Sequence, residues 1–198
     1  MPRRRGSLLA RAWKTFCYGL GTLVALVVLV QLWFFGHIVY WNFAEPASTA
    51  FMNRHLDRPG ARVRHAWVPY ERISPHLKRA VVAAEDAKFL SHEGFDWEAI
   101  HQAMLKNERR GRVVAGASTI SQQLAKNLFL SSQRSWARKA QEAAITWMME
   151  QTMSKRRILE LYLNFAEWGE GVFGAEAAAR HHFGSSAAHI SPEQAAWL

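Results

Sequence analysis

Two adjacent carboxylates, Glu85 and Asp86, stand at the end of an apolar segment that the sequence predicts to be helical. Ser74 can cap this helix and Pro75 suits its first turn, so a helix over 75–86 places both acids in its last turn. The helix dipole disfavours anions there by roughly 0.3–1 kcal/mol each. If the site is also partly buried, a carboxylate with a raised pKa can take a proton from a substrate hydroxyl near neutral pH, which makes this pair of acids a candidate source of a general base.

The alternative is that both acids lie in solvent, because exposed ion pairs are commoner than catalytic carboxylates. Cations that could pair with them stand nearby in the sequence, at Lys78, Arg79 and Lys88.

A polar stripe follows on a predicted helix over 119–129. Its members fall at i, i+3, i+4 and i+7, namely Thr119, Gln122, Gln123 and Lys126. Ile120, Leu124 and Leu128 form the opposite, core-facing stripe. Amides and hydroxyls beside one cation suit a ligand that carries many hydroxyls and a phosphate, whereas an ordinary solvated face would carry Glu and Lys instead.

The next predicted helix, over 134–153, carries Arg134, Arg138 and Glu142 at i, i+4 and i+8, with Lys139 beside them. An Arg–Glu pair at this spacing is usually a surface pair worth about 0.2–0.5 kcal/mol. Cations around a single acid would also suit a site that holds a departing pyrophosphate. We expect the inward face of this helix to be apolar, made of Ala140, Ala144, Trp147 and Met148.

The elements that must position these residues are almost all helical. The expected helices cover 75–86, 97–109, 119–129, 134–153, 155–165, 174–182 and 192–198. Helix 155–165 is apolar on most of its circumference, so we expect it at the centre of the core. Strand-like alternation is limited to a possible short strand at 63–68. Residues 109–116 form a basic, glycine-containing connection, and residues 42–73 are predicted to be an irregular lead-in.

Before this lead-in, residues 15–41 contain no Asp, Glu, Lys or Arg. This is long enough to span a bilayer core, for which about 20 apolar residues suffice. The preceding cations, Arg3, Arg4, Arg5, Arg11 and Lys14, place residues 1–14 in the cytoplasm by the positive-inside rule. We expect an uncleaved signal-anchor, with Trp33, Tyr40 and Trp41 as its outer aromatic belt; a cleaved signal peptide or a buried core helix fits the length less well.

Net charge and cysteine content limit the classes of function. The formal net charge is +9, of which five charges belong to the N-terminal tail. The remaining +4 suits an anionic membrane surface or a phosphate-bearing substrate better than nucleic acid. The single cysteine, Cys17, lies inside the predicted span, which excludes an intrachain disulfide and makes thiol catalysis implausible. The histidines show no metal-ligand spacing, so we expect no metal held by the protein.

Five ordered motifs resemble those of the peptidoglycan glycosyltransferases, glycosyltransferase family 51. They are Glu85-Asp86-x-x-Phe89-x-x-His92-x-Gly94, the run 116–127, Arg138-Lys139-x-x-Glu142, Lys155-x-x-Ile158-Leu159-Glu160-x-Tyr162-Leu163-Asn164, and Gly169-x-Gly171-x-x-Gly174-x-x-x-Ala178-x-x-x-His182-Phe183-Gly184. The resemblance covers residues 66–198. Ala117 replaces a common Gly and His182 a common Tyr, and neither change is expected to abolish activity. One span without a second outer domain resembles the monofunctional biosynthetic members.

The resemblance implies a mainly α, lysozyme-like domain, over 74–198, that polymerises lipid II at the outer face of the bacterial inner membrane. Glu85 would be the general base and Glu142 the second essential carboxylate. Residues that bind substrate or its pyrophosphate would be Ser118, Thr119, Gln122, Gln123, Lys126, Arg134, Arg138 and Lys139. No cofactor is required by this resemblance, although a divalent ion, Mg²⁺ or Mn²⁺, can accompany the pyrophosphate.

The implied partners are lipid II, the growing glycan chain, membrane lipid and other proteins of cell-wall synthesis or division. The family continues the helix that begins at Ser191, so the chain is expected to be truncated at Leu198. Two other functions stay open: a lytic muramidase that cleaves glycan, and a non-catalytic membrane-anchored scaffold.

Overall fold

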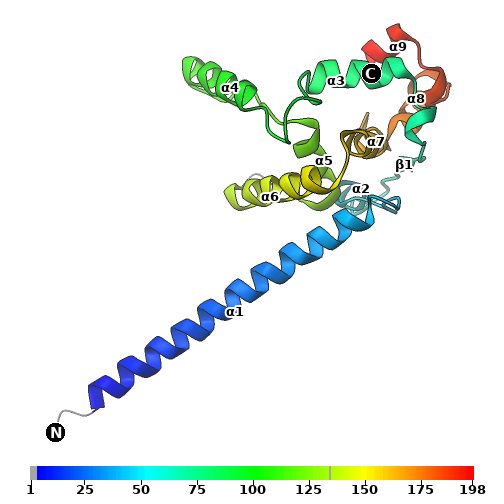
Figure 1. Ribbon diagram of the computed structural model, residues 1–198. Coiled ribbons are helices and arrows are strands. Elements are labelled where there is room, and N and C mark those ends of the chain that lie inside the picture. The colour runs from blue at the N-terminus through cyan, green and yellow to red at the C-terminus, as the bar shows by residue number, and fades with distance from the viewer. Residues whose placement is uncertain (1–3, 134) are drawn as a thin grey trace.

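The computed structural model of the chain describes residues 4–133 and 135–198. A long N-terminal helix, α1 (Arg4–Tyr40), projects from a helical domain that contains the other elements (Figure 1). Between Leu9 and Tyr40 this helix is long and apolar enough to cross a membrane, judged by length and composition. The predicted span over 15–41 therefore belongs to a helix that starts about three turns earlier.

The mainly α prediction is confirmed. The domain contains α2 (Ala50–Leu56), α3 (Pro75–Glu85), α4 (Trp97–Arg110), α5 (Ile120–Phe129), α6 (Trp136–Thr152), α7 (Lys155–Phe165), α8 (Ala175–Phe183) and α9 (Pro192–Trp197). Strands β1 (Arg64–His65) and β2 (Val172–Phe173) pair in parallel, with Arg64 opposite Val172. The possible strand at 63–68 is thus confirmed in β1, whereas its partner β2 was not predicted.

Local capping explains where the helices begin. The Asp96 side chain accepts a hydrogen bond from the Ala99 amide at the start of α4. Thr119 and Gln122 form a capping box at the start of α5. Ser154 caps α7, and Ser191 opens α9 in a second capping box. Because these signals depend only on neighbouring residues, they could be read from the sequence.

The lead-in over 42–73 is more ordered than predicted, because it contains helix α2. The Thr49 hydroxyl accepts a hydrogen bond from the Met52 amide and caps this helix. Met52 and His55 are buried, and α2 packs against α5. This burial stabilises a helix of seven residues, which would be marginal in isolation.

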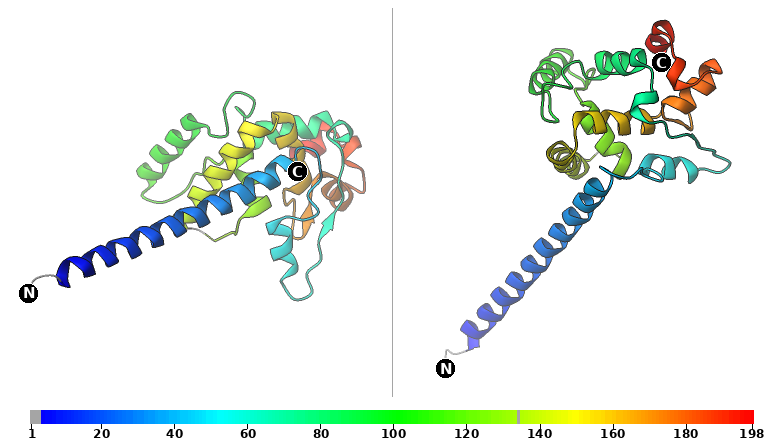
Figure 2. Two further views of the ribbon diagram at one scale, coloured as in Figure 1. Left: turned by 60° about the horizontal axis from the view of Figure 1, so that its bottom comes forward. Right: turned by 45° about the vertical axis from the view of Figure 1, so that its right-hand side comes forward.

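Helix α7 lies at the centre of the core, as predicted. It packs against α5, which in turn contacts α6, while α3 packs against α9 (Figures 1 and 2). The buried side chains of α7 are Ile158, Leu159, Leu161, Tyr162, Leu163, Asn164 and Phe165. Ile120, Leu124 and Leu128 form the expected buried stripe of α5.

The predicted inward face of α6 is wrong at Ala140 and Trp147, which are exposed, whereas Met148 packs against the core as predicted. Trp147 is 58% exposed, and the buried residues of this helix are instead Glu142, Ile145, Thr146 and Met149. The helix is therefore rotated so that its acid, rather than its tryptophan, faces the domain. A sequence pattern favours burial of the largest apolar side chain, but here the charge partners of Glu142 decide the orientation.

Asn164 connects α7 to the lead-in through two hydrogen bonds. Its side chain accepts a hydrogen bond from the Val68 amide and donates one to the Val68 carbonyl, both at 2.9 Å. The chain then returns so that Gly174 lies against the backbone of Asn164. Gly174 has a φ of +87°, and a Cβ at this position would be 2.4 Å from the Asn164 carbonyl oxygen.

We therefore expect Gly174→Ala to lower the free energy of unfolding by more than about 2 kcal/mol, since it combines a positive φ with a backbone clash. Gly111→Ala is a matched control, because Gly111 has a φ of +62° but the described residues leave no neighbouring atom within 4 Å of an added Cβ. Thermal unfolding of both variants measures the difference. Equal melting temperatures would show that the close approach at Gly174 does not constrain the fold.

Candidate active site

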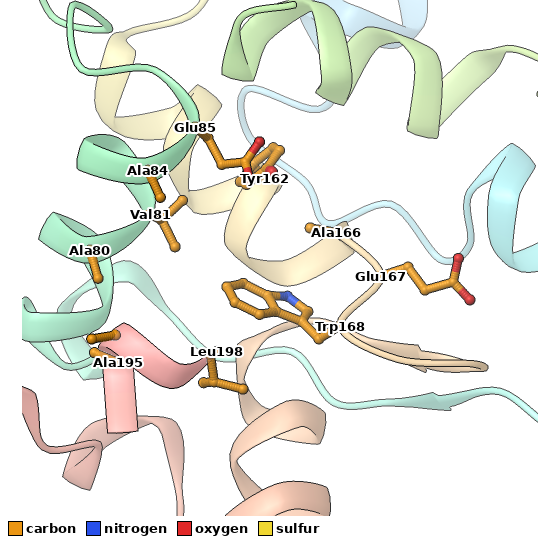
Figure 3. Close-up of a pocket in the computed structure, with 11 residues that line it drawn as sticks. Ala80, Val81, Ala84, Glu85, Tyr162, Ala166, Glu167, Trp168, Ala195 and Leu198 are labelled. Carbon is orange, nitrogen blue, oxygen red and sulfur yellow. The ribbon is translucent and has the colours of Figure 1, made fainter. Parts of the chain in front are cut away.

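Glu85 is the last residue of α3, and its side chain is exposed. The Gln123 side-chain nitrogen, from α5, donates a hydrogen bond of 2.7 Å to one Glu85 carboxylate oxygen. In Figure 3 the carboxylate lies at the edge of a cavity beside Tyr162. The expected partial burial of Glu85 is therefore not found, but the carboxylate is oriented by a specific partner and remains open to a ligand.

Tyr162 of α7 extends this arrangement and was not among the predicted site residues. Its hydroxyl donates a hydrogen bond of 3.1 Å to the Gln123 side-chain oxygen. Burial, and secondarily the negative charge of Glu85, raise the pKa of Tyr162 well above its usual value. Tyr162 thus stays protonated and fixes the amide orientation of Gln123. The sequence signal that could have identified Tyr162 is its hydroxyl among the apolar side chains of the second half of α7.

Asp86 has a structural role that differs from that of its neighbour. It is buried, and both of its carboxylate oxygens lie 2.9 Å from the ring nitrogen Nε2 of His92. One of them also accepts a hydrogen bond of 3.0 Å from the Ile120 amide at the start of α5. The alternative in which both acids lie in solvent is therefore wrong for Asp86. This residue ties the end of α3 to the N-terminus of α5, where an anion is favoured.

The second predicted acid, Glu142, is also buried, at 2% exposure. The Arg138 guanidinium donates to one carboxylate oxygen at 2.6 Å, and the Lys139 ammonium donates to the other. The predicted grouping of Arg138, Lys139 and Glu142 is thus found, with the acid inside the fold rather than at its surface. Arg134, the remaining predicted cation of this group, lies outside the described residues.

Lys126 of α5 is influenced by the charges of both Glu85 and Glu142. Burial lowers the pKa of its ammonium, and this effect is opposed by the charge of Glu142 and, more weakly, of Glu85, while Arg138 and Lys139 add to the lowering. Its ammonium lies 5.5 Å from the centre of the Phe51 ring. Both acids and both neighbouring cations therefore act on the charge of Lys126. An added anion would stabilise this charge and offset the cost of its burial.

Arg138 has a further capacity for an anion. Its guanidinium Nε atom is buried and has no hydrogen-bond partner within residues 4–133 and 135–198. Buried donors are rarely left unpaired in folded proteins. A phosphate oxygen would satisfy this donor, and Lys126 and Lys139 would share the added charge.

The predicted polar stripe of α5 does not form one exposed face. Thr119 and Gln122 are buried, and their side chains are engaged in the capping box; the Thr119 hydroxyl also donates to the Gly94 carbonyl at 2.7 Å. Ser118 is exposed, whereas Gln123 and Lys126 are half-buried. The accessible polar groups at this end of α5 are therefore Ser118, Gln123 and Lys126, while Thr119 and Gln122 hold the backbone that presents them.

Two cavities meet at Glu85. The first, of about 330 Å³, lies between α3, α7 and α9 and is lined by Glu85, Tyr162 and Trp168 among others (Figure 3). The second, of about 580 Å³, lies between the end of α3, the start of α4 and residues 116–119. In Figure 3 the Glu167 carboxylate points away from the first cavity. Glu85 is thus the carboxylate that faces both spaces.

The sequence did not predict a polar cluster that is centred on the buried Glu150 carboxylate. The Glu150 carboxylate accepts a hydrogen bond of 2.5 Å from the Ser121 hydroxyl and one of 2.8 Å from the Lys155 ammonium. It joins α5, α6 and α7. No role for Glu150 could be predicted from the sequence, because its partners lie on two other helices.

A protein-held metal ion does not fit the described residues, among which no group of three or more His, Cys, Asp or Glu side chains could bind one. The oxygens of Glu142 are engaged by cations. A divalent ion at this site would therefore need ligands from the substrate.

Comparison with known proteins identifies the family of this chain. Residues 52–198 match the family model described as transglycosylase. The chain is 61% identical over 190 residues to the biosynthetic peptidoglycan transglycosylase of Laribacter hongkongensis, covering 93% of this chain and 83% of that protein. It is 58% identical over 191 residues to the protein of the same name from Azoarcus sp., with 94% and 83% covered. The chain therefore belongs to the transglycosylase family.

Proposed function

We propose that this peptidoglycan glycosyltransferase polymerises lipid II, with Glu85 as the general base and Lys126, Arg138 and Lys139 as the group that stabilises the leaving pyrophosphate. The observation that carries the proposal is the position of Glu85. It is an exposed carboxylate at the junction of two cavities, oriented through Gln123 by Tyr162. Such a group can reach a hydroxyl in one space while a sugar carbon lies in the other.

In the proposed reaction Glu85 accepts the proton of the attacking hydroxyl, and the cationic group stabilises the leaving pyrophosphate. The 4-hydroxyl oxygen of the acceptor's terminal N-acetylglucosamine attacks the anomeric carbon of the donor's N-acetylmuramic acid. Its proton passes to Glu85, and the bond between the anomeric carbon and the phosphate oxygen breaks. Undecaprenyl pyrophosphate departs with the bonding electrons, and attack from the opposite face inverts the configuration from α to β.

The cationic group matters because negative charge develops on the departing pyrophosphate. Preorganised donors aimed at developing charge commonly contribute most to such a reaction. Glu142 holds Arg138 and Lys139 in place, so its role in the proposal is to orient cations rather than to move a proton. If a divalent ion accompanies the substrate, its ligands are phosphate oxygens and water.

Helix α1 supplies the membrane anchor that a lipid substrate requires. Tethering raises the effective concentration of a substrate that is confined to the bilayer. The N-terminal cations support a cytoplasmic N-terminus, and the proposal therefore has the catalytic domain on the periplasmic side of the inner membrane. Lipid II and the growing glycan chain are the proposed partners, together with other proteins of cell-wall synthesis or division.

Polymerisation of labelled lipid II by the full chain in detergent tests the proposal. We expect polymer from lipid II and no fragments from purified glycan strands. Fragments from the strands would instead identify a lytic muramidase, in which Glu85 acts as an acid. The absence of both products from a folded protein would favour the non-catalytic scaffold.

Lys126→Met separates binding of the pyrophosphate from stability. Because burial lowers the pKa of Lys126, its charge is unfavourable in the free protein, and we expect the melting temperature to stay the same or rise. Turnover of lipid II should fall by about 100-fold or more, since a cation that stabilises the leaving group is lost. Initial rates and thermal unfolding of the same samples check both expectations.

Lys78→Met is the matched control for this variant. The pKa of Lys78 is also lowered by burial, and its ammonium donates to the Tyr70 carbonyl. We expect normal turnover from the control. If Lys126→Met keeps the parent's rate, the pyrophosphate does not bind beside α5.

A further inference from the structure

Only one face of the membrane helix contacts the catalytic domain. Within α1, Phe34 and Ile38 are buried, and Gln31 is half-buried. With Trp41 just beyond the helix, these residues recur at intervals of three and four and form one stripe. Residues 9–30 are exposed. Of the described α1 residues that are at least half-buried, Gln31 is therefore the one farthest from the domain end of the helix.

Gln31 meets Gln141 of α6 in a reciprocal pair. The Gln31 amide nitrogen donates to the Gln141 side-chain oxygen at 2.9 Å, and the Gln141 nitrogen donates to the Gln31 oxygen at 3.0 Å. The views in Figure 2 show α6 close to the domain end of α1, and the two helices are in contact. Each amide thus satisfies the other in a segment where water is scarce.

The apolar contacts above this pair are less selective. Phe34 and Trp41 pack against Phe129, with ring centres 5.3 and 4.9 Å apart. In a membrane, apolar contacts between helices compete with lipid tails that are equally apolar, so they specify register weakly. A double hydrogen bond is directional, and a shift of one residue along α1 would turn Gln31 by about 100° and break it.

Gln141 precedes Glu142 in the helix that carries Arg138 and Lys139. Gln31 lies ten residues before Trp41, which corresponds to about 15 Å along the helix axis. The paired amides therefore hold α6 beside the last turns of α1, within the outer part of the apolar span. This contact therefore links the position of the α6 cations to that of α1.

We infer that Gln31 and Gln141 are positioning residues, which set the height of the α6 cations so that they meet the pyrophosphate of a bilayer-embedded lipid substrate. This inference rests on the proposed function. The isoprenoid tail keeps the pyrophosphate at the membrane surface, so a displacement of α6 misaligns the cations from their target. A misplacement of about 1 Å can lower a rate by about 100-fold.

The test compares two substrates with Gln31→Leu and Gln141→Leu. Undecaprenyl lipid II in phosphatidylglycerol-containing vesicles has its pyrophosphate at a fixed height, whereas a short-chain, water-soluble lipid II analogue does not. For each single variant we expect kcat for the vesicle-bound substrate to fall by about tenfold with little change in KM, and kcat for the soluble analogue to stay within about twofold of the parent.

The double variant Gln31→Leu/Gln141→Leu leaves no unpaired amide, so it carries the test if a single variant does not fold. We expect its loss to be no larger than that of either single variant, because all three remove the same pair. Thr22→Val is the matched control: the Thr22 hydroxyl donates to the Tyr18 carbonyl of its own helix, and its removal should leave both rates unchanged.

Equal losses on both substrates would overturn the inference by showing general damage to the domain. Unchanged rates on both substrates in all three Gln variants would overturn it as well. Failure of the proposed function has a different signature, since the parent chain itself would then polymerise neither substrate.

Discussion

Glu85→Gln is expected to lower the rate of lipid II polymerisation by about 1,000-fold, within the range that a general base contributes. The amide keeps the shape of the side chain and can still hydrogen-bond to Gln123, but it cannot accept the proton of the attacking hydroxyl. Because Glu85 is exposed, the melting temperature should change by little. Initial rates of polymer formation, with thermal unfolding of the same preparation, measure both quantities.

Glu93→Gln is the matched control for this variant. Glu93 is an exposed carboxylate in the same loop region after α3, and it lines neither of the two cavities that meet at Glu85. We expect the control to polymerise lipid II at the parent's rate. If Glu85→Gln retains more than about a tenth of the parent's rate, the general base is a different group.

Glu142→Gln is expected to impair stability and turnover together. It removes the carboxylate that Arg138 and Lys139 share inside the domain. Removing one partner of a fully buried ion pair costs roughly 3–5 kcal/mol. Lys139 is 41% exposed and can turn toward water, so we expect a loss of about 2–3 kcal/mol here. Chemical denaturation measures this loss.

Turnover by folded Glu142→Gln should fall by about 100-fold or more, because the cations no longer have a fixed orientation toward the leaving pyrophosphate. The matched control is Glu176→Gln. Glu176 is also buried, and it accepts hydrogen bonds from Arg180 four residues later and from the Ala187 amide. The control should be less stable but should turn over normally when folded. Equal activity of both variants would mean that Glu142 has only a structural role.

The two acids at the end of α3 show the limit of sequence reasoning at the site. Their position in the last turn of a helix could be predicted from the Ser74 cap and the apolar run before them. The same pattern did not distinguish Glu85 from Asp86. Asp86 is directed inward by His92 and by the Ile120 amide, which is 34 residues away in sequence, whereas Glu85 is left exposed at the cavities.

The orientation of α6 has a similar cause. Its length and charge spacing were predictable, but the buried face was not, because Trp147 is the larger apolar side chain. Burial of Glu142 depends on Arg138, Lys139 and the nearby Lys126 of α5. A propensity based on single residues cannot include this compensation, which exists only once the helices are packed.

The order of the residues was enough to predict the mainly α class, the long apolar helix and the order of the motifs, and the capping residues of α4, α5, α7 and α9 are equally local signals. These features depend on residues within a few positions of each other, where backbone hydrogen bonding and periodic burial act directly. Three features could be seen only in the folded chain: the pairing of Gln31 with Gln141, the link from Tyr162 through Gln123 to Glu85, and the Glu150 cluster. Each of these joins residues on different helices, and side-chain hydrogen bonds between distant segments form only after packing has brought their atoms within about 3 Å.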